Sequence, residues 1–79
     1  MDDLRGRIER RWVAQGSKSE REAVVLIDAT GQAHVLRRVG GNPFRDPQLD
    51  ALLGQSLLLL GEVRDSYFLV HQWQPIPEG

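Results

Sequence analysis

Cysteine is absent from this chain, which excludes disulfide bonds and thiolate metal sites as sources of stability. Long apolar runs are absent as well, because the runs at residues 23–27 and 57–60 are far too short to cross a bilayer. The charged N-terminus does not have the pattern of a signal peptide. We therefore expect a cytoplasmic protein that has no contact with a membrane.

Groups with catalytic or metal-binding chemistry are scarce. His34 and His71 lie far apart in the sequence without ligand-like neighbours, and the spacing contains no Ser–His–acid or paired-carboxylate arrangement. The net charge of −1 provides no bulk attraction for polyanions. These features predict a protein that is not an enzyme and that needs neither a cofactor nor a metal ion.

With 79 residues the chain is long enough for a single domain. We expect it to fold over residues 5–74, between flexible termini at residues 1–4 and 75–79. A core of this size seldom contributes more than about 3–5 kcal/mol. Good packing or self-association must therefore supply the stability.

One segment has the pattern of a helix, with signals for its start and its end. Asp46 is placed to be the N-cap, Pro47 follows at the first helical position, and Gly54 is placed to end the helix. Leucines recur on one helical face, at positions 49, 52 and 53. Phe44, just before the cap, is expected to plug the core.

The other apolar segments are typical of strands. Strands are expected at residues 5–15, 21–28, 33–39, 56–63 and 67–73. In the first, Gly6 and the Arg10–Arg11 pair interrupt the alternation, and a bulge or strong bend there would account for the switch from Ile8 and Arg10 to Trp12 and Val13. In the last, alternation places one set of side chains on the same face: Tyr67, Leu69, His71 and Trp73.

This order of three strands, one helix and two strands resembles the OB-fold, a five-stranded Greek-key barrel. The resemblance extends over residues 5–74 and concerns the order of the elements, with the helix between the third and fourth strands. An SH3-like small barrel is the alternative, but such a barrel normally lacks so well capped a helix. The resemblance implies a ligand groove framed in part by the loop between the first two strands, at residues 16–20.

Three groups of residues are candidates for binding. Hydroxyl and amine groups in the loop at residues 16–20 can hold a small anion: Ser17, Lys18 and Ser19. Basic side chains on the first and third strands can line a face of the barrel: Arg7, Arg11, Arg37 and Arg38. Two tryptophans can stack on bases: Trp12 and Trp73. Each group also has a structural interpretation, as a polar turn, as cross-strand ion pairs or as core aromatics.

The leading hypothesis is a non-enzymatic OB-like binding module that mediates protein–protein contacts or self-association. Residues 57–60 put two leucines on each face of a strand, so Leu58 and Leu60 need cover if the other pair enters the core. One alternative is the binding of single-stranded nucleic acid to an arginine-lined face. A weaker alternative is a small anionic ligand in the loop at residues 16–20.

Overall fold

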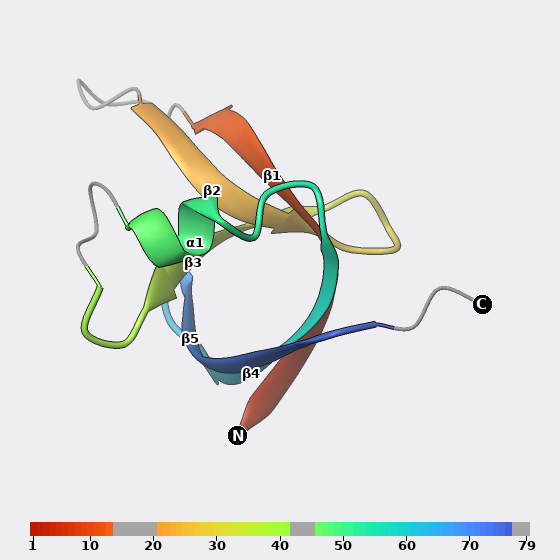
Figure 1. Cartoon of the computed structure of the whole chain (residues 1–79), viewed down its shortest axis with the longest axis vertical. Coiled ribbons are helices and arrows are strands. Elements are labelled where there is room, and N and C mark those ends of the chain that lie inside the picture. Colours follow the sequence, from red (N-terminus) through yellow and green to blue (C-terminus); the bar gives the residue numbers. More distant parts are fainter. Residues whose placement is uncertain (14–20, 42–45, 77–79) are drawn as a thin grey trace.

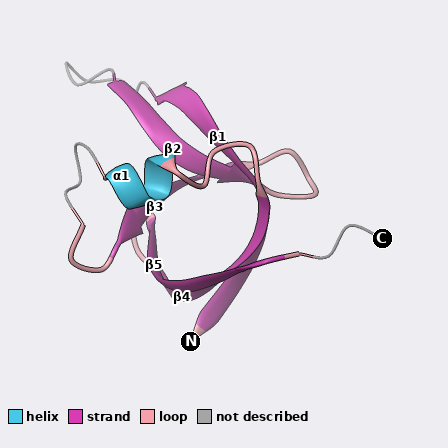
Figure 2. Cartoon of the chain, viewed as in Figure 1, coloured by secondary structure: helices cyan, strands magenta, loops and turns pink. Residues whose placement is uncertain are grey.

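The computed structural model describes residues 1–13, 21–41 and 46–76. Within these ranges five strands form one sheet that closes in a ring, and a single short helix lies at one end of it (Figures 1 and 2). The elements are β1 (Asp2–Val13), β2 (Arg21–Ile27), β3 (Ala33–Arg38), α1 (Pro47–Asp50), β4 (Ser56–Val63) and β5 (Phe68–Pro75). The predicted small, mainly β, barrel-like fold with a helix between the third and fourth strands is confirmed.

The order around the ring is β1-β2-β3-β5-β4, and only the β3–β5 pair is parallel among the described strand pairs. β1 closes the ring because its first half pairs with β4 and its second half pairs with β2. Gly6 lies where these two pairings meet. A Cβ atom there would be 2.1 Å from the carbonyl oxygen of Ile27, so only glycine permits this approach of the backbones.

Strand alternation explains the core. Ile8, Leu26 and Leu36 share the inner face through the registers of β1, β2 and β3, and all three are buried. The other buried members come from β4, β5 and the helix segment: Leu57, Leu59, Phe68, Val70, Leu49 and Leu52. One buried residue, Val25, lies on the outer face, where it is flanked by Glu9 and Val35 in the register.

The helix begins as predicted but is shorter. The Asp46 carboxylate accepts a hydrogen bond from the backbone N–H of Gln48 at 3.0 Å, with Pro47 at the first helical position. Regular helix ends at Asp50, and turns continue to Gly54, whose φ of 85° is the left-handed conformation expected of a terminating glycine. Phe44 lies outside the described residues.

Leu52 and Leu53 make a matched pair for testing how the helix segment stabilises the core. Leu52 is buried in the core, whereas Leu53 is half-buried and packs against it. We expect Leu52→Ala to lower the free energy of unfolding by about 2–5 kcal/mol and Leu53→Ala to lower it by less. Urea denaturation of both variants measures the difference. Equal losses would contradict this packing.

The expectation of a frayed start to β1 is wrong, and the bulge that was one explanation of its apolar pattern is absent from its described part. Its first residues are not a frayed end, because Asp2, Asp3 and Leu4 pair with β4 in a continuous register. There is also no bulge in the described part of β1, since the pairing with β2 continues without a shift. Ile8 and Trp12 therefore share one face with Arg10 between them.

The predicted alternation in β5 is also wrong. The register with β4 shifts at Leu60 and Gly61, and the shift leaves His71 as an extra residue on β5. Residues after this bulge change faces. As a result, Trp73 lies opposite the buried Leu59 and packs against the core, and the strand continues to Pro75 instead of ending at the tryptophan.

Leu58 and Leu60 lie on the outer face of β4 but are half-buried. In the register, Leu58 lies between Arg5 and Gln74, and Leu60 occupies the equivalent place between Asp3 and Gln72. Both leucines therefore present only part of their surface to solvent. Within the described residues, no helix is long and apolar enough to cross a membrane.

Candidate functional site

A two-stranded ribbon extends from one end of the ring (Figure 1). It consists of residues 10–13 of β1 and 21–24 of β2, which pair only with each other among the described residues. We call this the projecting ribbon. Two-stranded sheets are only marginally stable by themselves. The edges of the ribbon present unpaired backbone N–H and C=O groups, to which another strand can add.

The backbone of β1 has an open edge along this ribbon. The N–H of Ile8 donates to the carbonyl oxygen of Gln55 at 2.9 Å, and its own carbonyl accepts from Gly54 at 2.8 Å. These groups therefore point away from β2. Backbone groups alternate in direction along a strand, so those of Arg10 and Trp12 point to the same side, where no described strand pairs with them. We call this side the open edge of β1.

Two residues of the open edge carry large side chains: Arg10, which is fixed by an ion pair, and Trp12, which is exposed. Arg10 donates to the Asp50 carboxylate at 2.8 Å and lies 3.8 Å from a carboxylate oxygen of Glu22. Trp12, two residues further along the same face, is 61% exposed. Tryptophan surface of this extent is costly to leave in water and is common at protein interfaces.

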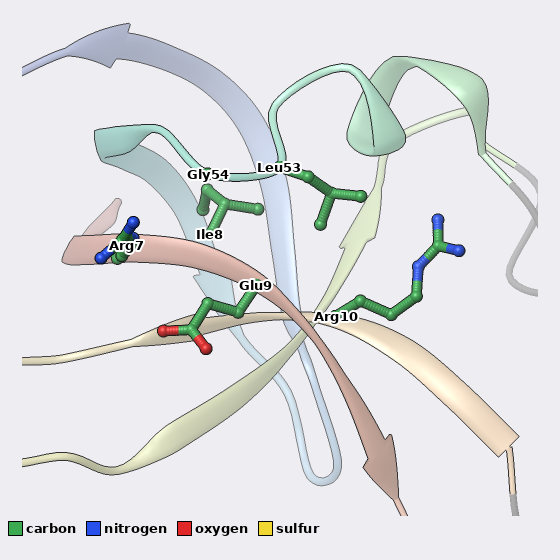
Figure 3. A pocket seen from close by; sticks show the side chains of 6 residues that line it. All are labelled: Arg7, Ile8, Glu9, Arg10, Leu53 and Gly54. Atoms are coloured by element: carbon green, nitrogen blue, oxygen red, sulfur yellow. The ribbon is translucent and has the colours of Figure 1, made fainter.

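A shallow hollow lies where the open edge begins. Its lining comes from β1 and from the turn after the helix: Arg7, Ile8, Glu9, Arg10, Leu53 and Gly54. Figure 3 shows Leu53 and Gly54 across the hollow from the strand, with the side chains of Glu9 and Arg10 directed to opposite sides of β1. The hollow and Trp12 are thus neighbours on one strand.

The predicted arginines divide between the two faces of the sheet. Arg7, Arg11 and Arg37 are on the outer face, as their register partners show. Arg11 pairs with the Glu9 carboxylate at 2.9 Å. The Arg37 guanidinium lies 4.4 Å from the centre of the Tyr67 ring, and its buried Nε has no described hydrogen-bond partner.

Arg38 points inward instead. Its Nε donates to the Asp46 carboxylate at 2.9 Å, and Asp46 is the one buried charged residue among those described. The same carboxylate caps the helix. Arg38 therefore joins β3 to α1 and is not available on the face that carries Arg37.

The two tryptophans do not lie beside the outer-face arginines. Trp12 is on the opposite face of β1 from Arg7 and Arg11, and Trp73 is directed to the core. Tyr67 is half-buried beneath an arginine. The predicted anion site at Ser17, Lys18 and Ser19 lies outside the described residues.

A second polar cluster stabilises the β2–β3 hairpin. The Asp28 carboxylate accepts hydrogen bonds from the backbone N–H and the hydroxyl of Thr30, and its other oxygen lies 2.8 Å from Nε2 of His34. The His34 imidazole and the Thr30 hydroxyl hold the pKa of the Asp28 carboxyl well below its usual range. Gly31 completes the turn with a φ of 87°.

This cluster predicts a pH dependence of stability. Because the pKa of Asp28 is lower in the folded chain, its ionised form stabilises the fold above the unfolded-state pKa of about 4. That contribution is lost as the pH falls further through the acid range. We expect Asp28→Asn to be less stable than the unaltered chain at pH 7, with a difference that shrinks below about pH 4. Denaturation at both pH values measures this, and a constant difference would contradict it.

The sequence prediction missed Arg10, Asp50 and the hollow at Leu53 and Gly54. The alternation from Ile8 through Arg10 to Trp12 was the available signal, but the expected bulge concealed it. No protein-family model matches the chain, and no curated protein or solved structure is significantly similar to it.

Proposed function

We propose that this chain is a non-enzymatic binding module that acts by associating with another polypeptide strand along the open edge of β1. One observation carries the proposal. The backbone groups of Arg10 and Trp12 have no described partner, and the same edge carries an indole that is 61% exposed. Strand addition supplies affinity through backbone hydrogen bonds and specificity through adjoining pockets. The edge and the hollow have these two properties.

The proposed class of fold is the OB-like barrel. The order of the strands around the ring and the helix between β3 and β4 support it over an SH3-like barrel. The ionisable groups support a binding role, because described pairs such as Asp46 with Arg38 and Asp28 with His34 hold structural elements together. The proposed module therefore acts through its surface and not through a reaction.

Site-specific photocrosslinking tests the proposed function. A benzoylphenylalanine at position 12, in place of Trp12, should form adducts with a polypeptide when the full chain is irradiated in the cells that make it. Val63 is the matched control because it is 68% exposed and lies near the other end of β1. Adducts must map to position 12 and decrease when Arg10→Pro blocks the edge. Equal labelling from positions 12 and 63 would contradict the proposal.

Single-stranded nucleic acid is the second candidate ligand. The outer-face placement of Arg7, Arg11 and Arg37 favours it. Fluorescence anisotropy with a labelled oligonucleotide at two salt concentrations provides the test, since phosphate contacts weaken steeply as salt rises. Salt-sensitive binding that Arg7→Ala or Arg37→Ala weakens would support this function, and an absence of binding at low salt would exclude it.

A further inference from the structure

We propose that the strand which adds to the open edge of β1 belongs to a second copy of this chain, in an antiparallel, two-fold symmetric dimer. This inference rests on the proposed function and names the partner. Trp12 projects from the same edge that carries the hollow able to receive it. The lining of the hollow ends at Arg10, two residues before Trp12. A surface that carries both a projecting side chain and a hollow for it is self-complementary. Two copies can then make the same contact twice and form a closed two-fold dimer.

The backbone directions determine the register. Arg10 and Trp12 direct their N–H and C=O groups outward, so these two residues must form the hydrogen-bonded pairs of an antiparallel contact. The symmetric arrangement places Arg10 opposite Trp12 of the second copy and Trp12 opposite Arg10. Arg11 then lies on the two-fold axis, opposite itself. The second strand cannot shift toward Ile8, because the N–H and C=O groups of Ile8 already form hydrogen bonds with Gln55 and Gly54.

The side chains favour the same register. Cross-strand neighbours in such pairs lie about 5 Å apart, which brings the indole of one copy against the Arg10 guanidinium of the other. An arginine over an indole face is a favourable cation–π contact. Asp50 holds the guanidinium in place with a 2.8 Å hydrogen bond, so little ordering is required when the indole arrives.

The hollow gives the indole a place to pack against the half-buried Leu53 and the exposed Gly54. The hollow begins at Ile8, which is buried and lies one diagonal position along the edge from the indole of the second copy, within reach of a large aromatic side chain. Two symmetric copies of this contact surround the axis. The tryptophan that is exposed in the monomer thereby becomes buried in the dimer.

The charges on the opposite face of the contact do not prevent it. Arg11 of each copy meets its equivalent at the axis, and like charges directly opposite one another are destabilising. Each Arg11 is already paired with Glu9 at 2.9 Å, so two neutralised pairs meet instead of two free cations. We expect dimerisation to depend only weakly on salt.

Sedimentation measures the association. We expect a contact of one short strand pair to fall in the size range of weak complexes, so the full chain should change from monomer to dimer as its concentration rises toward about 1 mM. Trp12→Ala should weaken dimerisation about 30-fold or more. Val63→Ala removes another exposed apolar side chain and should leave dimerisation unchanged.

Disulfide trapping tests the register. Because the chain has no cysteine, Arg11→Cys places one thiol on the proposed axis, where the facing Cα atoms are about 4.5 Å apart, within the range of a disulfide. Arg7→Cys is the matched control, on the same face of β1 but paired with strands on both sides. Mild oxidation should link Arg11→Cys into a covalent dimer far faster than Arg7→Cys.

The results separate this inference from the proposed function. A monomer at about 1 mM with equal trapping of both cysteine variants would overturn the dimer, as would a dimer that Trp12→Ala does not weaken. If position 12 still crosslinks to a different protein, the proposed function stands and only the identity of the partner is wrong. If position 12 crosslinks to nothing above the Val63 control, both fail.

Discussion

Replacing Gly61 with alanine is expected to lower the free energy of unfolding by about 3 kcal/mol or more. Gly61 is buried at the register shift between β4 and β5. A Cβ atom there would lie 1.8 Å from the carbonyl oxygen of Leu69 and 3.1 Å from the Phe68 ring. The clash is with the backbone of a paired strand, so it cannot be relieved by a rotation of a side chain.

Gly31→Ala is the control for the Gly61 prediction. Gly31 has a φ of 87°, but a Cβ atom there would meet nothing within 4 Å. Its replacement should therefore cost only the strain of the left-handed conformation, about 1–2 kcal/mol. Urea denaturation measures both variants. A loss for Gly61→Ala no larger than that for Gly31→Ala would show that β5 does not approach β4 as closely as described.

Asp46→Ala is expected to lower the free energy of unfolding by about 3–5 kcal/mol. The Asp46 side chain is only 4% exposed and performs two tasks, capping the helix at Gln48 and pairing with Arg38. Removing it leaves the largely buried Arg38 without its carboxylate. The change also leaves a space beside Gly41, which lies so close to the carboxylate that a Cβ atom at position 41 would be 2.1 Å from an Asp46 oxygen.

Two further variants separate the cap from the ion pair. Asp46→Asn keeps an oxygen that can accept from Gln48, so it should be more stable than Asp46→Ala by about 1 kcal/mol. Arg38→Met combined with Asp46→Ala should cost less than the sum of the single changes, because it leaves no unpaired charge. Additive losses would show that the two side chains do not interact in solution.

Local signals were sufficient for most of the elements. Short apolar runs, alternating or continuous, predicted all five strands. Asp46, Pro47 and Gly54 marked the helix segment correctly because capping depends only on neighbouring residues. The two faces of the β2–β3 hairpin also followed from alternation, with Arg37 and Arg38 on opposite sides as expected.

The features that were missed depend on contacts between distant segments. Asp2 and Asp3 do not resemble a strand, and they join β1 because β4 pairs with them. The extra residue at His71 follows from the close approach at Gly61 of the neighbouring strand, and it turns Trp73 toward the core. The open edge likewise exists because the pairing with β4 ends near Ile8, which the sequence of β1 alone does not indicate.

Amide hydrogen exchange at the projecting ribbon reports whether the edge of β1 is open in the monomer and covered on association. In dilute solution the amides of Glu9 and Arg11, which face β2, should exchange slowly, and those of Arg10 and Trp12 should exchange fast. Raising the concentration through the dimerisation range should slow exchange at Arg10 and Trp12 only. If these two amides are already as protected as their neighbours in the monomer, the edge of β1 is not open. If they stay fast in a chain that sedimentation shows to be dimeric, the dimer does not form along this edge.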